Sequence, residues 1–412
     1  MSAETRFLER QFRRYYIDNA SKIKPPRALP QREFGFTVTG KGGMIRHIGF
    51  KTPNELHEFL RENAPTNSYY SSALYREPEA PDMPLKGWIG ADLAFDIDAD
   101  HIDTPCKLRH DSWLCAECGQ KGTGLVPQKC PKCNSHKLEQ ETWLCEECLG
   151  KAKSEAIRLI HEFLRDELGF QVDEMEIRFS GHRGYHVLIG NEKAIRLEQG
   201  ARREITDYMR GVGAVPDGAG FRKPKATMEG PNLEDPGWQG RIARGIAHLL
   251  KEHENNLGSS VALGRSDLQM LTTKRAEILI DLEKKPPSWD WLGKLSKNGR
   301  AFLVEAAADR EASEIDPLVT QDVHRLMRLP GSLHAKTGFI VKPLSITELE
   351  RFDPWRDAVA FKNGDLRVHI RDMPETKIGD VKMGPVHEED VVVPFAVGLY
   401  LIAKKRAVFK EP

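Results

Sequence analysis

The pattern of apolar and polar positions predicts strands in two parts of the chain. Residues 93–98 have the sequence Leu-Ala-Phe-Asp-Ile-Asp, in which large apolar side chains occupy every second position. Residues 175–179 alternate in the same way, and an apolar run resumes at 185–189 after a turn that contains Gly181 and Gly184. A period of two places successive side chains on opposite faces of a strand. We therefore predict one strand over 93–98 and a tight hairpin over 175–189.

Helical spacing dominates elsewhere. Apolar residues recur at helical intervals over 156–168, and Gly169 follows at the position where helices commonly end. From 193 to 312 the pattern predicts an inserted helical subdomain, with helices over 241–253, 268–284 and 289–308. The last part returns to strand and short-helix signals, at 339–341, 345–352 and 397–402.

Asp96 and Asp98 lie on one face of the first predicted strand, because they are two positions apart. Two carboxylates on one face repel each other unless cations lie between them, and Mg²⁺ takes carboxylate oxygens. Two such ions roughly 3.5–4 Å apart can hold the attacking and leaving oxygens of a phosphoryl transfer. An acidic strand end that only terminates a sheet has the same pattern, so the pair alone leaves both interpretations open.

Three polar side chains surround the turn of the predicted hairpin: Ser180, Arg183 and His186. They supply a hydroxyl, a fixed positive charge and an imidazole, while the glycines let backbone N–H groups approach a ligand. This group suits a triphosphate. The alternative is a solvated arginine and a buried, hydrogen-bonded histidine.

A third segment combines one acid with several cations. Asp316 comes first, and the cations that follow are Arg325, Arg328, His334 and Lys336. A third metal ligand beside phosphate-binding cations is the functional interpretation, and a basic surface loop with an ordinary Pro-Gly turn is the alternative. The co-occurrence of all three segments favours a nucleotidyl-transfer site.

All seven cysteines fall between residues 106 and 148, largely as C-x-x-C pairs. They are Cys106, Cys115, Cys118, Cys130, Cys133, Cys145 and Cys148. Together with His110 they offer the ligands of two tetrahedral zinc sites. A disulfide framework is the alternative. Because we find no signal peptide and no apolar span of about 18 residues, we expect a cytoplasmic protein in a reducing interior.

Overall charge gives no general attraction to nucleic acid. Lysine plus arginine equals aspartate plus glutamate, at 61 each. A neutral chain has no global positive field, so binding of a nucleic acid would depend on local patches. This balance indicates a weak, transient grip on a template. The 412 residues are enough for more than one domain.

The chain resembles the catalytic (small) subunit of archaeal and eukaryotic DNA primases, most closely the archaeal form. The segments that carry the resemblance are 12–16, 32–36, 46–50, 69–72, 95–100, 180–186, 316–338 and 352–354. The resemblance implies an α/β (α+β) fold, in which a mixed-sheet catalytic core carries an inserted zinc-binding module and an inserted helical subdomain. The domains we expect are catalytic core at 1–105, 151–192 and 313–412, the zinc-binding insertion at 106–150 and the helical insertion at 193–312.

The resemblance also implies roles for single residues. In that family a D-x-D pair and a later aspartate hold the catalytic metals, which corresponds to Asp96, Asp98 and Asp316 here. The positions that correspond to nucleotide contacts are Ser180, Arg183, His186, Arg328, His334 and Lys336. Some relatives carry lysine where this chain has Arg328, and the two cations bind phosphate differently, since arginine is bidentate.

The eight zinc ligands can pair in two ways. In the nested arrangement one site has Cys106, His110, Cys145 and Cys148, and an inserted ribbon has Cys115, Cys118, Cys130 and Cys133. In the sequential arrangement the first four ligands in the chain share one ion and the last four share the other. We prefer nesting, because residues 143–153 run from a cysteine pair straight into a predicted helix, as the family motif does. The eight-ligand insertion is larger than in many relatives, so a second zinc ion departs from the family pattern.

The resulting prediction is a nucleotidyltransferase, a DNA primase subunit of the replication machinery that makes short primers on single-stranded DNA from NTPs or dNTPs. It would use Mg²⁺ or Mn²⁺ in catalysis and two structural Zn²⁺ ions, without any membrane partner. The resemblance implies a heterodimer with a large, iron–sulfur subunit and a place at the nucleoid. Two alternatives stay open: a stand-alone primase-polymerase of repair or of a mobile element, and a catalytically silent zinc-ribbon scaffold for single-stranded nucleic acid.

Overall fold

The computed structural model describes residues 2–223, 227–252 and 263–410. The chain divides into two compact units. The larger comprises Met1–His161, Phe170–Arg202 and Ile315–Pro412, and the smaller comprises Glu162–Gly169 and Arg203–Glu314. The helical insertion predicted over 193–312 overlaps the smaller unit in most of its length. The other boundaries, at 105, 150 and 192, stay predictions.

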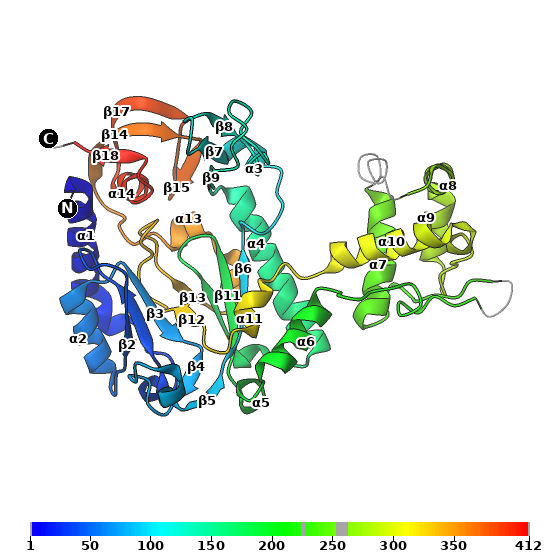
Figure 1. The fold of residues 1–412 in the computed structure, drawn as a ribbon, viewed down its shortest axis with the longest axis horizontal. Helices are drawn as coiled ribbons and strands as arrows, with labels where there is room; N and C mark the ends of the chain where they lie inside the picture. Colours follow the sequence, from blue (N-terminus) through cyan, green and yellow to red (C-terminus); the bar gives the residue numbers. More distant parts are fainter. Residues whose placement is uncertain (1, 224–226, 253–262, 411–412) are drawn as a thin grey trace. The chain divides into compact units, whose positions relative to one another are not determined.

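A four-stranded antiparallel sheet that carries β2 (Met44–Ile48) and β3 (Asn67–Ser71) lies in the larger unit (Figure 1). Its order is β12 (Leu326–Arg328), β3, β1 (Phe34–Thr37) and β2. The helices α1 (Ala3–Asn19) and α2 (Pro53–Asn63) pack on this sheet. Phe12 and Tyr16 of α1 share one apolar core with Phe34 and Tyr70 of the strands, and burial of such aromatic surface is the main stabilising term.

A second four-stranded antiparallel sheet carries both segments predicted as strands. Its order is β13 (Lys342–Leu344), β10 (Met175–Phe179), β11 (Gly184–Ile189) and β6 (Leu93–Asp98). The strand predicted at 93–98 and the hairpin predicted at 175–189 are confirmed. The α+β class is confirmed as well, but every described pairing in these two sheets is antiparallel, where the sequence had suggested one mixed sheet.

A long helix covers the second sheet. It begins as α4 (Glu146–Arg158), which contacts β11 and β6, and continues as the π-helical turns of η4 (Leu159–Glu167). Ala152 and Ala156 are fully buried on its inner face. Gly169 follows with φ +74°, the left-handed conformation that glycine adopts without strain, so the predicted helix end is confirmed.

Between β6 and α4 lies the segment in which the sequence predicts a zinc-binding insertion. Its small sheet has the order β8 (Lys121–Thr123), β7 (Ser112–Cys115) and β9 (Leu138–Glu141), and α3 (Lys107–His110) precedes it. The strands β7 and β9 pair antiparallel from Ser112 opposite Glu141 to Cys115 opposite Leu138.

The C-terminal part of the larger unit adds a third sheet, of order β17 (Val386–Pro394), β14 (Asp365–Met373) and β18 (Ala407–Phe409). The apolar run at 397–402 lies in α14 (Phe395–Ala403), and 345–352 contains α12 (Ile346–Arg351). The strand signal at 339–341 yields only isolated bridges at Phe339 and Ile340.

The remaining elements of the larger unit are short connections. They are η1 (Ala20–Lys22), η2 (Leu29–Gln31), β4 (Ala73–Tyr75), η3 (Met83–Lys86), β5 (Trp88–Ala91), η5 (Val172–Glu174), α5 (Glu192–Ile195), α11 (Pro317–Gln321), α13 (Pro354–Asp357), β15 (Thr376–Ile378) and β16 (Val381–Met383). The helix α6 (Gln199–Met209) begins in the larger unit and ends in the smaller one.

The smaller unit is helical, as predicted, with its own apolar core around Trp289 and Leu303. Its elements are α7 (Gly237–Lys251), α8 (Arg265–Thr273), α9 (Arg275–Glu283), η6 (Leu292–Lys294) and α10 (Lys297–Glu311). The helix predicted over 241–253 is α7, although residue 253 lies outside the described residues. Two predictions were wrong in detail. The helix at 268–284 is interrupted at Lys274, and the helix at 289–308 begins only after Ser296, whose side chain caps α10.

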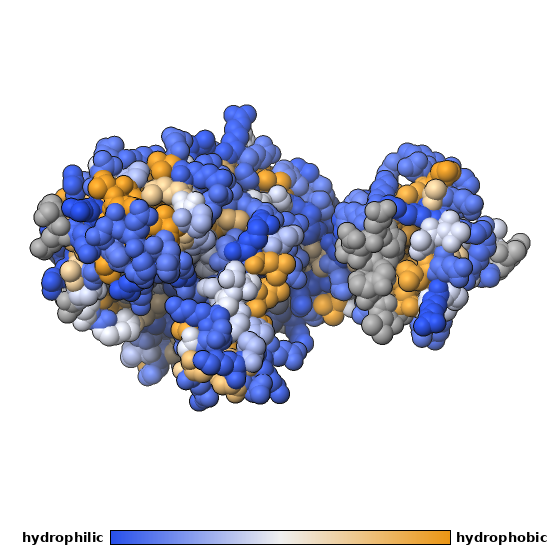
Figure 2. Space-filling model, turned by 90° about the horizontal axis from the view of Figure 1, so that it is seen from above, coloured by the Kyte–Doolittle hydropathy of each residue, from blue (hydrophilic) through white to orange (hydrophobic). Residues whose placement is uncertain are grey.

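Hydrophilic residues cover most of the face shown in Figure 2, and hydrophobic residues reach it in separate patches. Such a distribution is ordinary for a protein with buried cores. Among the described residues, no helix has the length and apolar composition that crossing a membrane requires.

Candidate active site

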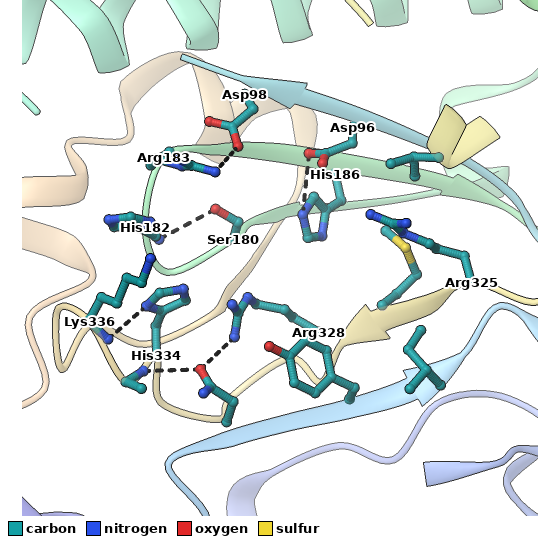
Figure 3. A pocket seen from close by; sticks show the side chains of 16 residues that line it. Asp96, Asp98, Ser180, His182, Arg183, His186, Arg325, Arg328, His334 and Lys336 are labelled. Carbon is teal, nitrogen blue, oxygen red and sulfur yellow. Dashed lines mark hydrogen bonds and ion pairs between the residues drawn. The ribbon is translucent and has the colours of Figure 1, made fainter. Parts of the chain in front are cut away.

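Asp96 and Asp98 are at the end of β6, the edge strand of the second sheet. Both carboxylates point into the same cavity (Figure 3). The alternation read from the sequence is therefore correct, because Phe95 and Ile97 are fully buried on the other face. The side chains of the two acids keep 21% and 15% of their surface exposed, enough for a ligand to reach them.

Asp316 lies next to this pair although it follows 218 positions after Asp98 (316 minus 98). Its backbone N–H donates to the backbone carbonyl of Asp96 at 2.9 Å, which fixes the start of α11 against β6. Its carboxylate caps α11 by accepting from the N–H of Leu318 at 2.9 Å. The fold thus brings the third predicted acid beside the other two.

The crowding of these acids changes their chemistry. Burial, with the charges of Asp98 and Asp316, raises the pKa of Asp96 to about 7, although Arg325 and Arg183 act in the opposite direction. A carboxylate whose ionised form is this unfavourable gains stability from a nearby cation. The acids therefore form a site suited to divalent metal ions.

The hairpin β10–β11 places the second group of predicted residues beside the acids. His186 pairs with Asp96 across the strands, and Gly184 pairs with Asp98. A Cβ on Gly184 would lie 1.8 Å from the carbonyl oxygen of Ile97, so only glycine allows this register. Gly181, with φ +80°, makes the turn itself.

In this structure the hairpin residues contact the acids and the backbone of the turn. The guanidinium of Arg183 pairs with Asp98 at 2.8 Å and also with Asp100, so it bridges acids in this structure. His186 Nε2 lies 3.4 Å from Asp96 Oδ1. Ser180 Oγ accepts from the backbone N–H groups of His182 at 3.4 Å and Gly184 at 3.2 Å, which stabilises the turn. All three predicted residues nevertheless line the cavity.

Arg328 faces the acids from the first sheet. It ends β12, beside β3, and its guanidinium donates to Asn67 Oδ1 at 2.8 Å and lies 4.8 Å from the centre of the Tyr69 ring. No carboxylate lies within 4.0 Å of it among the described residues. An arginine held by a neutral amide and a ring face keeps most of its donors for an anion.

His334 and Lys336 come from the loop that follows β12. The N–H of Lys336 donates to His334 Nδ1 at 3.1 Å, and the His334 ring stacks on His182 with centroids 4.7 Å apart. Burial, reinforced by the nearby cations, lowers the pKa of His334, His182 and His186 well below the usual value. These imidazoles are neutral at physiological pH and act as hydrogen-bonding groups.

The cavity that these residues enclose measures about 430 Å³. Its polar lining consists of Asn67, Tyr69, Asp96, Asp98, Ser180, His182, Arg183, His186, Arg325, Arg328, His334 and Lys336. Acids from β6 lie on one side and cations from β12 and its loop lie on the other (Figure 3). A polar cavity of this size accommodates a nucleotide.

The cysteines and His110 form two groups, each with its four ligand atoms within 4.8 Å of one another. The first group is Cys106, His110, Cys145 and Cys148, and the second is Cys115, Cys118, Cys130 and Cys133. This grouping is the nested one. Both sets have the composition and spacing of tetrahedral zinc sites.

The first group is built into the larger unit. Cys106 and Cys148 are fully buried, and His110 Nδ1 lies 2.8 Å from Asp111 Oδ1, which orients the ring for ligation through Nε2. Hydrogen bonding from Cys148, and then from His110, lowers the pKa of Cys145 to about 3, so a thiolate is already favoured. The second group is more peripheral, since Cys133 is exposed.

Comparison with known proteins identifies the family. A family model of the DNA primase small subunit matches residues 135–346. The DNA primase small subunit PriS of Nitrosopumilus maritimus is 31% identical over 407 residues, 98% of each chain. PriS of Cenarchaeum symbiosum is 34% identical over 401 residues, 96% of each, and PriS of Methanocella arvoryzae is 33% identical over 406 residues, 90% of each.

The chain belongs to the DNA primase small subunit family. The resemblance inferred from the sequence, including the archaeal form, is thereby confirmed. The match to the first of these relatives covers 98% of both chains, so the similarity extends well beyond residues 135–346 that the family model matches.

Three residues of this primase small subunit line the cavity without having been assigned a role from the sequence: His182, Asn67 and Tyr69. His182 lies inside a segment that the sequence singled out, and Tyr69 begins another family-like segment, so both positions could have been found. No pattern in the sequence indicated Asn67. Its amide holds both Arg328 and the N–H of Ala335, a role that appears only when β3 and β12 pair.

Proposed function

We propose that this chain is the catalytic subunit of a DNA primase, which makes short primers on single-stranded DNA for replication by nucleotidyl transfer. The observation that carries the proposal is a cluster of three carboxylates, two of which line a cavity opposite Arg328, a cation that no described carboxylate pairs. Family membership over the whole chain supports the same reaction class.

Asp96, Asp98 and Asp316 would hold the catalytic metal ions. The raised pKa of Asp96 supports this assignment, because three clustered acids are stable together only with cations or protons between them. Two bound Mg²⁺ or Mn²⁺ ions would lower the pKa of the attacking 3′-hydroxyl and neutralise the departing pyrophosphate. Arg183 would give up part of its pairing with Asp98 when the acids take up metal.

Arg328, His334, Lys336, Ser180, Arg183 and His186 would orient the triphosphate. Arg328 is held in position by Asn67 and Tyr69, so its bidentate contact with a phosphate would lose little side-chain freedom. The neutral His334 would donate from Nε2, because its Nδ1 accepts from Lys336 N–H. Such positioning supplies most of the advantage in phosphoryl-transfer enzymes.

Both cysteine groups would hold structural Zn²⁺, because each has four protein ligands and no open position for substrate. The first ion would tie the segment that follows β6 to the start of α4, which covers the catalytic sheet. The second would stabilise the ribbon of β7, β8 and β9.

The partners that family membership implies are a single-stranded DNA template, NTPs or dNTPs, the large iron–sulfur subunit and the replication machinery of the cell interior. The domain division with three core segments also belongs to this proposal. Neither the zinc-ribbon scaffold nor the stand-alone primase-polymerase is favoured. A scaffold has no use for three converging acids, and the match to small subunits over nearly the whole chain argues against a separate primase-polymerase.

The test is synthesis on an unprimed single-stranded DNA template with labelled ribo- or deoxynucleotides and Mg²⁺ or Mn²⁺. We expect short products from the wild-type chain and none from Asp98→Asn. The matched control is Asp173→Asn, which removes an exposed aspartate outside the cavity and should leave synthesis unchanged. Full activity in Asp98→Asn would refute the metal assignment, and absence of products from the wild type with and without a primer would refute the polymerase reaction for the isolated subunit.

A further inference from the structure

A second cavity, of about 470 Å³, adjoins the nucleotide pocket. The two cavities share His182, Arg183 and Lys336. Beyond these residues the second cavity, which we call the lysine groove, is lined by Asp100, Gln140, Glu141, Thr142, Ala403, Lys404 and Lys405. It therefore runs between β9 of the zinc-binding insertion and the end of α14.

Both carboxylates of the lysine groove are already paired. Asp100 binds Arg183, and Glu141 binds Arg406 at 2.7 Å. The lysines of the groove have no such partner, since among the described residues no carboxylate lies within 4.0 Å of Lys336, Lys404 or Lys405. The groove thus has an excess of positive charge.

Lys404 is the most unusual of these cations. Its ammonium donates to His182 Nε2 at 3.1 Å, and the same Nζ lies 5.8 Å from the centre of the Trp143 ring and 5.9 Å from that of Tyr400. Burial, followed by the charges of Lys336 and Arg183, lowers the pKa of Lys404 to about 8. The Lys404 side chain is therefore held where burial and neighbouring cations disfavour its charged form.

Other buried cations of this chain have strong acceptors around them. Arg32 lies 2.9 Å from a carboxylate oxygen of Asp92, and Arg241 lies 2.8 Å from both Glu162 and Glu167. Arg202 pairs with no described acid, but its guanidinium donates to the backbone carbonyls of Leu197, Asp92 and Ala91. Among the described residues Lys404 has only a neutral imidazole and two ring faces, and a partly buried cation in such surroundings is stabilised by an anion from outside. In the lysine groove the missing partner is an anion.

His182 connects the groove to the nucleotide pocket. One face of its ring stacks on His334, and its Nε2 accepts from Lys404. An anion that bridges Lys336 and Lys404 would therefore lie beside, and continuous with, a triphosphate held by Arg328 and His334.

We propose that Lys404, together with His182 and Lys336, forms a second phosphate-binding subsite that extends the nucleotide pocket toward α14. The inference rests on the proposed function for the nucleotide in the neighbouring cavity. Its ligand is a phosphate group, from either the outer end of a nucleoside triphosphate or the backbone of a nucleic acid strand, because both present the same oxygens to lysine.

The direct test measures binding of inorganic tripolyphosphate to the full chain by calorimetry. Lys404→Met removes the charge and keeps an unbranched apolar side chain, so we expect about tenfold weaker binding of tripolyphosphate, while Lys404→Arg retains most of the affinity. The matched control is Lys410→Met, which removes a charge from the same C-terminal segment outside both cavities. Unchanged tripolyphosphate binding in Lys404→Met would overturn the subsite.

Two further ligands distinguish the sources of the phosphate. If the triphosphate end occupies the subsite, Lys404→Met lowers the affinity for a non-hydrolysable nucleoside triphosphate about tenfold. The affinity for the corresponding monophosphate stays the same. If a nucleic acid strand occupies the subsite, the variant instead lowers the affinity for single-stranded DNA. The dependence of that affinity on salt concentration then falls by the amount expected for about one phosphate contact. Either result supports the subsite, and no change with any ligand refutes it.

A measurement on the wild-type chain covers the case in which Lys404→Met fails to fold. Reductive methylation at pH 8, read by mass spectrometry, should be slower at Lys404 when tripolyphosphate is present and unaffected at Lys410. Equal labelling of Lys404 with and without tripolyphosphate would overturn the proposal. Because neither binding nor labelling requires catalysis, these results are independent of whether the chain synthesises primers.

Discussion

The two sides of the proposed nucleotide pocket carry opposite charges and are built in opposite ways. On the acidic side, Asp96, Asp98 and Asp316 repel one another, and the pKa of Asp96 is raised to about 7. On the basic side, Arg328 is held by the neutral Asn67 and Tyr69. The acidic side therefore needs cations from solution, whereas the basic side is preorganised for an anion. In the proposed function, metal and triphosphate would therefore complete the site together.

The largest effect should come from the acidic side. Asp316→Asn keeps a good helix N-cap for α11 but removes one metal-ligating charge. We expect primer extension to slow about 1000-fold, since metal-ion stabilisation of the transition state amounts to several kcal/mol. The measurement is single-turnover extension. The affinity for a triphosphate analogue, measured without metal, should change less than about twofold. A large loss of that affinity would show that the acids also bind the triphosphate, contrary to the separation of an acidic and a basic side.

A smaller effect is expected on the basic side. Arg328→Gln removes the bidentate charge and should weaken triphosphate binding about 10–100-fold, whereas Arg328→Lys should weaken it less. Calorimetry with a non-hydrolysable triphosphate measures both. Metal binding to the acids in the absence of nucleotide should stay the same, and a loss of metal affinity as large as that in Asp316→Asn would show that the two sides are not separable.

The two cysteine groups, proposed to bind zinc, differ in where they lie. The first group adjoins β6 and α4, so it supports the acidic side, while the second lies in the peripheral ribbon. Cys148→Ser should reduce primer extension about tenfold or more and lower the melting temperature. Cys130→Ser in the ribbon should release one Zn²⁺ with a smaller loss of extension. Equal losses in the two variants, measured alongside zinc content, would contradict this ranking.

The smallest effect concerns stability. Because folding raises the pKa of Asp96 from its usual value near 3.8 to about 7, the favourable protonated form is lost as the pH rises through that window. Asp96→Asn should therefore stabilise the metal-free protein at pH 8, by about 1–2 kcal/mol. Thermal unfolding should show this gain at pH 8 and little of it at pH 4. A divalent ion should abolish the gain, and destabilisation at pH 8 without metal would contradict the proposed repulsion.

Local patterns predicted the parts of the fold where one physical signal dominates. The alternation over 93–98 gave the strand and the common face of Asp96 and Asp98, since one buried face enforces a period of two. The signal failed at 268–284 and 289–308, because a helical spacing does not reveal a break at Lys274 or a start at Ser296. Helix ends depend on caps and packing more than on spacing.

The amino-acid sequence alone determined which chemical groups are present: the acids, the cations and the two sets of zinc ligands. The tertiary structure decided which of them meet. It placed Asp316 against Asp96 through a backbone hydrogen bond, turned Arg183 toward Asp98 and brought Lys404 to His182. Periodicity reports only neighbours within one element. Contacts between residues hundreds of positions apart depend on how the sheets, helices and loops pack, and packing is a property of the whole chain.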